Sequence, residues 1–509
     1  MKARGKTLGE LEHHLSGLAR AAGPAAASTS VSGITHDSRR VRPGYLFVAL
    51  RGQHTDGHRY VDAAVAAGAA AVIVQEADSA AGLSVPAVVV CDTRRALAEL
   101  SVAFWEEPSR ALKLVGVTGT NGKTTTTMLV ASIGRAAGLR SAVLGTLGLI
   151  AEDRVTRTEH TTLEAPDLQE ALAALVEEGV DLVATEVSSH GLVLDRVWRT
   201  YFDVGAVTNI SQDHLDFHET MADYAAAKGL LFTRYADLAR GVKTMRGVVN
   251  WDDEWSRRLA AEARCEVLRY AVESDEAEVR AESIEYAPRA TRFDLLLPDG
   301  RHAVTMSLVG RFNVENALAA AGCAVALGLP SDAVVEGLVA AQQPPGRLEK
   351  VEAGQDFLVL VDYCHTPDAV AQVLREARRL AQGRVLCVIG CGGDRDPGKR
   401  PKMGAAATEL ADWTVITSDN PRSEDPAAII RAIVEGARQG RYETVEGRRE
   451  AIRRAVDLAR PGDVVLIGGK GHEDYQILGD RTIHFDDREE AREAILERMA
   501  RRPGRPRQQ

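Results

Sequence analysis

The sequence of 509 residues lacks the features of membrane, secreted and nucleic-acid-binding proteins. Its six cysteines are too few in a chain of this length for a disulfide framework, so we interpret them as buried thiols. No apolar run approaches the roughly 20 residues that span a bilayer, and the charged start, MKARGKTLGELEHHL, has no signal-peptide core. A formal net charge of −10 gives no basic signature of nucleic-acid binding. We therefore expect a cytoplasmic enzyme without membrane insertion and without a nucleic-acid partner.

Hydrophobic residues make up 45% of the chain and charged residues 26%, as in ordinary globular proteins. At roughly 150 residues per domain, the length predicts about three domains. Two segments marked by proline, EEPSRA and QQPPGRLEK, have the composition of linkers. They predict domains over residues 1–111, 112–342 and 343–509.

Short apolar runs alternate with helical patterns in all three predicted domains, which indicates the α/β class. Residues 70–75 and 86–91 are expected strands of the first domain, and residues 180–187 and 202–210 are expected strands of the second. Such alternation is typical of a parallel sheet covered on both faces. Residues 269–307 have the period-two pattern of hairpins and predict an antiparallel extension of that sheet. The runs RVLCVIG, WTVITS and DVVLIGG predict another doubly wound sheet in the last domain.

A glycine- and threonine-rich segment, GVTGTNGKTTTT (residues 116–127), follows a predicted strand and precedes a predicted helix over 124–137. This is the context of a phosphate-binding loop, in which backbone N–H groups and the helix dipole attract phosphate oxygens. Gly119 and Gly122 would let the backbone approach the ligand, Lys123 would reach the terminal phosphates, and the Thr124 hydroxyl would bind Mg²⁺. The strict pattern has glycine where Val117 stands. A glycine-rich turn without a ligand is the alternative.

Eleven strings in order, from about Asp37 to Gln476, resemble the Mur ligase family. They are DSRRVRPGYLFVALRG, GVTGTNGKTT, EVSSHGL, NISQDHLDFH, AAKGLLF, GRFNVENALAA, PPGRLEKV, VDYCHTPDA, GCGGDRDPGKRP, SDNPRSEDP and GGKGHEDYQ. The resemblance implies a domain that binds a UDP-sugar, a central P-loop domain that binds ATP and a Rossmann-like domain that binds an amino acid. It also implies a probable monomer that acts in peptidoglycan synthesis with Mg²⁺ and ATP.

The branch that the chain resembles adds meso-diaminopimelate to UDP-N-acetylmuramoyl-L-alanyl-D-glutamate through an acyl phosphate. For ATP, the resemblance implies contacts at Gly119, Thr120, Asn121, Gly122, Lys123, Thr124, Thr125, Asn316, Arg347 and Asp362. For metal binding and catalysis it implies Lys123, Glu186, His214 and Lys228. In the family this last lysine is carbamylated, which turns a cation into the oxygen ligand that Mg²⁺ prefers. Carbon dioxide adds only to a neutral amine, so the site would have to depress the pKa of Lys228.

The UDP-sugar peptide would contact a set of residues in the first two domains. By resemblance these are His36, Ser38, Gln53, His54, Thr55, Thr161, Thr162, Ser188 and Arg196. Three positions near them depart from the usual pattern of the family, namely Tyr45, Leu163 and Leu194. A fourth departure, Cys364, replaces the usual alanine near the ATP contacts, and we assign it no nucleophilic role.

The incoming amino acid is identified by SDNPRSEDP. Lysine and meso-diaminopimelate differ by one distal carboxylate, so discrimination needs a cation, and Arg422 offers a planar fork for two hydrogen bonds. In the family, DNPR marks the diaminopimelate-adding branch. The implied contacts are Arg395, Asp419, Asn420, Pro421, Arg422, Gly469 and Glu473.

Two rival interpretations stay open at this point. Folylpolyglutamate synthase has a similar loop and fold, but its residue after the loop lysine is typically glycine, whereas Thr124 stands here. A binding protein that keeps the fold without turnover is the other rival, although the intact set of candidate catalytic residues argues against it.

Overall fold

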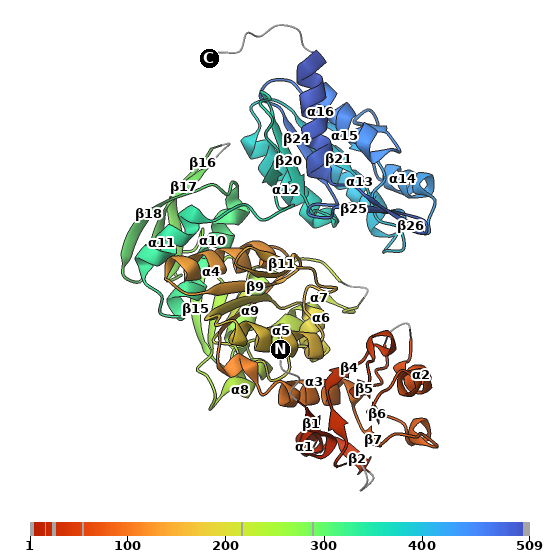
Figure 1. The fold of residues 1–509 in the computed structure, drawn as a ribbon. Helices are drawn as coiled ribbons and strands as arrows, with labels where there is room; N and C mark the ends of the chain where they lie inside the picture. The colour runs from red at the N-terminus through yellow and green to blue at the C-terminus, as the bar shows by residue number, and fades with distance from the viewer. Residues whose placement is uncertain are drawn as a thin grey trace.

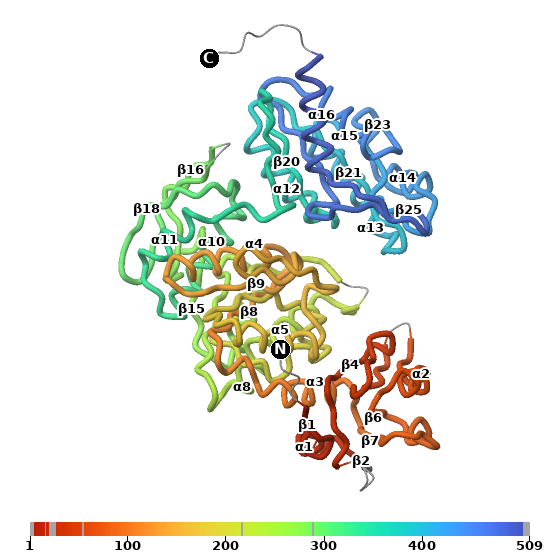
Figure 2. The backbone as a smooth tube through the Cα atoms, viewed as in Figure 1, coloured from red at the N-terminus to blue at the C-terminus, as the bar shows by residue number. Residues whose placement is uncertain are grey.

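The computed structural model describes residues 5–15, 17–22, 27–52, 55–214, 217–287 and 290–501. Within these ranges the chain forms an N-terminal, a central and a C-terminal body, each built around its own sheet (Figure 1). The bodies follow one another in chain order, as the backbone trace shows (Figure 2). No helix in the described ranges has both the length and the apolar character needed to cross a membrane. The predicted α/β class is confirmed.

The N-terminal body has a sheet of order β2-β7-β6-β5-β4, in which β4 to β7 run parallel and β2 is antiparallel to β7. The predicted strands over 70–75 and 86–91 are present as β6 and β7. Helix α3 covers one face, and the Asp92 side chain caps its first turn. The elements are β1 (Lys6–Thr7), α1 (Leu8–Glu12), β2 (Ala19–Ala22), β3 (Ser30–Val31), β4 (Gly33–Thr35), β5 (Tyr45–Val48), α2 (Val61–Ala66), β6 (Ala71–Val74), β7 (Ala87–Val90) and α3 (Thr93–Phe104).

The central sheet has the order β11-β10-β9-β12-β8-β13-β14-β15-β16-β17-β18. Strands β9, β12, β8, β13, β14, β15 and β16 are parallel, and β17 and β18 extend the sheet antiparallel, as the pattern of 269–307 predicted. The strands are β8 (Lys113–Thr118), β9 (Ser141–Gly145), β10 (Gly148–Ala151), β11 (Arg154–Thr156), β12 (Leu182–Glu186), β13 (Val204–Val207), β14 (Arg246–Asn250), β15 (Glu266–Ala271), β16 (Val279–Tyr286), β17 (Thr291–Leu297) and β18 (Gly300–Met306).

Both faces of the central sheet are covered at its middle strands, which explains why β8, β9, β12 and β13 are almost wholly buried and largely apolar. Leu114 of β8 packs with α5, α7 and α8, whereas Val115 and Val117 pack with α4, α10 and α11 on the other face. The helices are α4 (Lys123–Ala136), α5 (Ala165–Glu177), α6 (Ser189–Val193), α7 (Met221–Gly229), α8 (Arg234–Ala239), α9 (Glu254–Glu262), α10 (Arg311–Ala326) and α11 (Ser331–Ala340). The β10–β11 hairpin at the far edge was not predicted, because β11 is fully exposed and has no apolar pattern.

The C-terminal sheet has the order β19-β20-β24-β21-β22-β23, with β20 to β23 parallel. Helices cover both of its faces, so the predicted doubly wound sheet is confirmed. The β25–β26 hairpin was not predicted. The elements are β19 (Glu349–Lys350), β20 (Leu358–Asp362), α12 (Pro367–Leu380), β21 (Val385–Ile389), α13 (Lys399–Leu410), β22 (Trp413–Ile416), α14 (Pro426–Val434), β23 (Tyr442–Thr444), α15 (Arg448–Leu458), β24 (Val464–Gly468), β25 (Tyr475–Leu478), β26 (Arg481–His484) and α16 (Asp487–Arg501).

Polar contacts join the bodies. Arg40 and Arg95 of the N-terminal body form ion pairs with Asp167 and Asp195 of the central body, at 2.6 Å and 2.8 Å. On the other side, the Arg311 backbone N–H at the start of α10 donates to Glu376 of α12, at 2.9 Å. Arg157 after β11 also pairs with Asp474 of the C-terminal body. These contacts place the phosphate loop opposite the C-terminal sheet.

Candidate active site

A cavity of about 530 Å³ lies between the central and C-terminal bodies. Its wall includes most residues predicted to contact ATP and several predicted to contact the sugar nucleotide or a metal: Thr120, Asn121, Gly122, Lys123, Thr124, Thr125, Thr161, Glu186, Ser188, His214, Asn316, Arg347 and Asp362. The cavity therefore joins three groups of candidate residues that are far apart in the sequence.

The predicted phosphate loop connects β8 to α4, and two of its glycines are required by geometry. Gly119 and Gly122 have φ values of 141° and 87°, a region that side chains with a Cβ rarely adopt. A Cβ at Gly119 would overlap the hydroxyl of Thr208, and one at Gly122 would overlap the amide of Asn316. Helix α4 begins at Lys123, so its N-terminal N–H groups face the cavity.

Two lysines lie beneath this loop. The Lys123 ammonium donates to the carbonyls of Gly119 and Thr120, each at 2.9 Å. The Lys228 ammonium, on α7, donates to the same Gly119 carbonyl at 2.9 Å and is 1% exposed. Burial lowers the pKa of Lys123, and burial together with the neighbouring Lys123 charge holds the pKa of Lys228 well below its usual range. Burial therefore disfavours the charged form of the Lys228 amine.

Glu186, at the end of β12, is 1% exposed and fully engaged in hydrogen bonds. Its carboxylate accepts from the Thr124 hydroxyl at 2.9 Å and from the backbone N–H and hydroxyl of Thr146 at 2.8 Å and 3.1 Å. The Thr146 hydroxyl also lies 3.1 Å from that of Thr161. The sequence analysis missed Thr146. Its position after Gly145, at the end of β9, could have pointed to it. Strands β9 and β12 are parallel neighbours, so the residues that follow them lie at the same edge of the sheet.

The oxygens of Thr124 and Glu186 fit a hard cation such as Mg²⁺, which prefers oxygen ligands. His214 lines the same cavity, with a positive φ of 52°. Its side chain is 46% exposed, lies 3.5 Å from the Asp213 carboxylate and packs against the His190 ring at 4.9 Å. Among the described residues, no group of three or more His, Cys, Asp or Glu side chains is arranged to hold a metal ion.

Arg347 enters the cavity from the junction between the central and C-terminal bodies. Its guanidinium lies 3.4 Å from the Thr124 hydroxyl and 5.0 Å from the centre of the Tyr363 ring. Among the described residues its buried Nε has no hydrogen-bond partner, so the group can still bind an anion. Burial raises the pKa of Asp362, which accepts the Leu348 backbone N–H at 2.7 Å and so holds the junction.

The predicted sugar-nucleotide residues that the structure describes belong to the N-terminal and central bodies. The Thr162 hydroxyl contacts that of Ser188 at 3.0 Å, and Arg196 donates to the Thr162 carbonyl at 3.0 Å. Arg196 also pairs with Glu164 at 2.8 Å. Burial lowers the pKa of His36, against the opposing effect of Glu164. Ser38 begins a short turn beside His36 and Thr55 is exposed, whereas Gln53 and His54 lie outside the described residues.

The residues predicted to bind the amino acid gather at the carboxyl ends of the C-terminal strands. Asn420 donates to Glu473 at 2.8 Å, and Asp419 lies 4.0 Å from the Lys470 ammonium. Arg422 donates to the Gly393 carbonyl at 2.7 Å. A Cβ on Gly392 would lie 2.9 Å from Arg422 and 3.9 Å from Arg395. A Cβ on Gly469 would overlap Asp419. Cations and carboxylates thus lie side by side, which suits a ligand with both ammonium and carboxylate groups.

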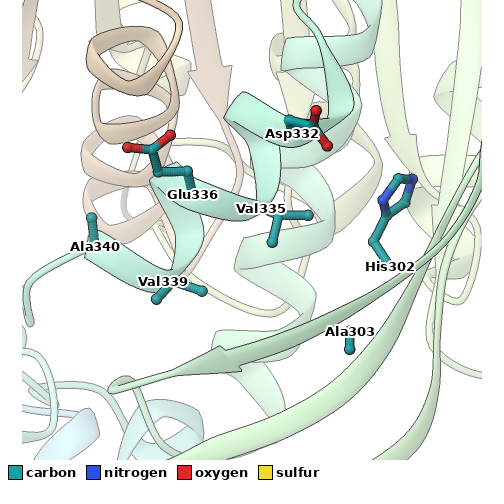
Figure 3. Close-up of a pocket in the computed structure, with 7 residues that line it drawn as sticks. All are labelled: His302, Ala303, Asp332, Val335, Glu336, Val339 and Ala340. Atoms are coloured by element: carbon teal, nitrogen blue, oxygen red, sulfur yellow. The ribbon is translucent and has the colours of Figure 1, made fainter.

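A second hollow lies between β18 and α11 and shares no residue with the cavity at the phosphate loop (Figure 3). Its wall combines His302 with the acids Asp332 and Glu336 and the apolar side chains Val335 and Val339.

Comparison with known proteins gives one consistent family. Residues 30–105 match the model described as "Mur ligase family, catalytic domain", residues 117–324 match the Mur ligase middle domain, and residues 346–471 match "Mur ligase, glutamate ligase domain". The chain is 45% identical to UDP-N-acetylmuramoyl-L-alanyl-D-glutamate--2,6-diaminopimelate ligase of Bacillus licheniformis, over 92% of this chain and 95% of that protein.

Solved structures agree with this. A structure of UDP-N-acetylmuramoyl-L-alanyl-D-glutamate--2,6-diaminopimelate ligase has a TM-score of 0.65 and 34% identity, over 93% of this chain and 96% of that one. Folylpolyglutamate synthase of Mycobacterium tuberculosis, complexed with ADP and AMPPCP, has a TM-score of 0.61. At 21% identity over 72% of this chain and 91% of the synthase, this rival shares the fold alone.

Proposed function

Since the chain belongs to the Mur ligase family, we propose that it joins meso-diaminopimelate to the D-glutamate of UDP-N-acetylmuramoyl-L-alanyl-D-glutamate, with cleavage of ATP to ADP and phosphate. The enzyme is an ATP-dependent ligase of peptidoglycan synthesis. One observation carries the choice of amino acid: Arg422 and Arg395 both flank Gly392, and Asn420 of the same loop donates to Glu473 at 2.8 Å. This pairing of charges suits a diamino diacid.

We assign one substrate to each of the three bodies. Residues 1–111 would hold the UDP-sugar, residues 112–342 ATP, and residues 343–509 the amino acid. Support comes from Thr161 and Ser188, which line the cavity together with the phosphate loop. A peptide held by these hydroxyls reaches the γ-phosphate without leaving the cavity. We place the enzyme in the cytoplasm as a monomer.

The first chemical step transfers the γ-phosphoryl group of ATP to the glutamate carboxylate of the precursor, which gives an acyl phosphate and ADP. Anion approaches anion in this step, so positive charge must be held at the site. Lys123 and Arg347, which both line the cavity, supply it. Thr124, Glu186, His214 and Lys228 as its carbamate would hold Mg²⁺, which neutralises phosphate charge when bound.

The carbamate at Lys228 rests on the low pKa of this buried amine. The neutral nitrogen adds to the carbon of carbon dioxide and releases one proton, which leaves an anionic carbamate with two oxygens. These two oxygens are ligands of the kind that Mg²⁺ prefers. The carbamate anion would also attract the neighbouring Lys123 ammonium.

In the second step the amine of meso-diaminopimelate attacks the acyl carbon, and phosphate leaves through a tetrahedral intermediate. Arg422 and Arg395 would hold the distal carboxylate, and Glu473 would hold an ammonium group. The nucleophile comes from the C-terminal body and the acyl phosphate from the central body, so the two must close on each other. Closure excludes water, which would otherwise hydrolyse the acyl phosphate.

The test is phosphate release by the purified enzyme with ATP, Mg²⁺, the UDP-linked dipeptide and either meso-diaminopimelate or lysine, with each substrate omitted in turn. We expect release only with the full set and a strong preference for meso-diaminopimelate. A preference for lysine would overturn the choice of amino acid. No release with any combination would favour a binding protein that has the fold without turnover.

A further inference from the structure

The loop that carries Arg422 connects β22 to α14 and is held in an unfavourable conformation. Arg422 has a φ of 52°, in the left-handed region, where a residue with a side chain is strained. The guanidinium can point at a ligand only while this backbone conformation persists. Neighbouring structure must therefore stabilise the loop.

The β25–β26 hairpin supplies much of that support through its backbone. The Arg422 N–H donates to the Ile477 carbonyl at 3.2 Å, and the Gly479 N–H donates to the Arg422 carbonyl at 2.8 Å. These two bonds form an isolated parallel bridge between Arg422 and Leu478. The hairpin backbone therefore forms hydrogen bonds with both the N–H and the carbonyl of Arg422.

A buried glutamine of the same hairpin holds the residues before Arg422. Gln476 is 6% exposed, and its amide donates to the Asp419 carbonyl at 2.6 Å and to the Ser418 hydroxyl at 3.3 Å. The next residue, Ile477, donates its N–H to the Asn420 side chain at 3.0 Å. Nothing in the reaction assigned above uses the Gln476 side chain.

Hydrogen bonds also connect the loop of Arg422 to Glu473. The Lys470 ammonium, fully buried, donates to the side-chain amide oxygen of Asn420 at 3.0 Å and to the Glu473 carboxylate at 3.2 Å. The Asn420 amide also donates to Glu473, at 2.8 Å. Arg422 and Glu473 are therefore joined through Asn420, Lys470 and the hairpin into one rigid frame, whose dimensions decide the length of diacid that fits.

We propose that Gln476 is a positioning residue for amino-acid selectivity, and that the β25–β26 hairpin is the element that fixes the separation between Arg422 and Glu473. This inference rests on the proposed function, because it assigns the frame to the selection of a diamino diacid. Gln476 itself makes no contact with substrate in this account. It acts by holding the Asp419–Asn420 backbone.

The variant Gln476→Met tests this, since it keeps the length and burial of the side chain and removes both hydrogen bonds. Loss of bonds to a buried carbonyl and hydroxyl predicts a rise of about tenfold in the KM for meso-diaminopimelate. The preference for meso-diaminopimelate over lysine falls by the same factor. The KM values for ATP and for the UDP-linked dipeptide stay unchanged, as they would not if the variant were merely misfolded.

The matched control is Gln355→Met. Gln355 lies between β19 and β20 of the same body, and its side chain bonds the backbone of Val351 and Ala353, each at 2.7 Å. We expect no change in selectivity there. Should Gln476→Met fail to fold, Gly479→Ala takes its place: a Cβ there meets nothing within 4 Å, so only strain at its φ of 62° is added to the hairpin turn. It should lower selectivity in the same direction.

Two outcomes separate the claims. A wild-type enzyme that uses meso-diaminopimelate selectively, with an unchanged KM and selectivity in the folded variant, would refute the role of Gln476 and leave the proposed function intact. A wild-type enzyme that does not select meso-diaminopimelate would refute the proposed function itself.

Discussion

Replacing Arg422 by methionine should remove the discrimination between meso-diaminopimelate and lysine. The Arg422 guanidinium is half-buried and uses one nitrogen, Nη1, on the Gly393 carbonyl at 2.7 Å. Its remaining nitrogens can offer a carboxylate two charge-assisted hydrogen bonds, each contributing about 1.5 kcal/mol at a partly solvated site. Together they amount to about 3 kcal/mol, or roughly a hundredfold in kcat/KM for meso-diaminopimelate.

The assay is phosphate release at saturating ATP and UDP-linked dipeptide, with meso-diaminopimelate or lysine varied. Lysine has no distal carboxylate, so its kcat/KM should stay within a few-fold of the wild-type value. The control is Arg431→Met, because this arginine lies on α14 in the same body, with a side chain that is 69% exposed and paired only with Asp425 at 3.4 Å. An equal loss of kcat/KM for both amino acids, or a loss below about threefold for meso-diaminopimelate, would show that Arg422 does not bind the distal carboxylate.

Three further outcomes follow from the geometry. Lys228→Ala should abolish turnover, and acetate or bicarbonate should restore part of it; full activity without either would exclude the carbamate. Thr146→Val removes one hydroxyl bond to buried Glu186 and should lower kcat about tenfold or more, whereas Thr408→Val, a buried threonine remote from the site, should leave kcat unchanged. Burial lowers the pKa of His472 to about 4. The unfolded chain therefore takes up a proton near pH 6.5 before the folded chain does, and the free energy of unfolding falls as the pH drops from 6.5 toward 4. In His472→Gln the free energy of unfolding, measured by denaturant titration, should fall less between pH 6.5 and pH 4. An equal fall in the variant and the wild type would show that His472 does not cause this pH dependence.

Local signals predicted much of the fold. The phosphate loop, helix α4 and the strands of the parallel sheets are set by short-range patterns, and the structure has α4 only one residue from its predicted start. The two glycines of the loop follow the same logic, since their φ values are a backbone requirement. For the backbone of the phosphate loop, the local sequence was sufficient to predict the structure.

Long-range packing set what could not be predicted. The MADYAAAKG pattern of α7 does not reveal that Lys228 is buried, because its partner, Gly119, lies 109 positions away in the sequence. The sequence around Gln476 does not reveal its role either. The Asp419 carbonyl that it binds is 57 positions away and belongs to an irregular loop. Polar networks of this kind form only after the sheets have assembled.

The central claim is that the cavity brings a substrate carboxylate to the γ-phosphate of ATP. The direct measurement uses a UDP-linked dipeptide whose glutamate γ-carboxylate is labelled with ¹⁸O, and follows the label by mass spectrometry during turnover with ATP, Mg²⁺ and meso-diaminopimelate. An acyl phosphate predicts that each phosphate released carries one labelled oxygen from the carboxylate. Phosphate without label, formed together with the tripeptide product, would contradict the account.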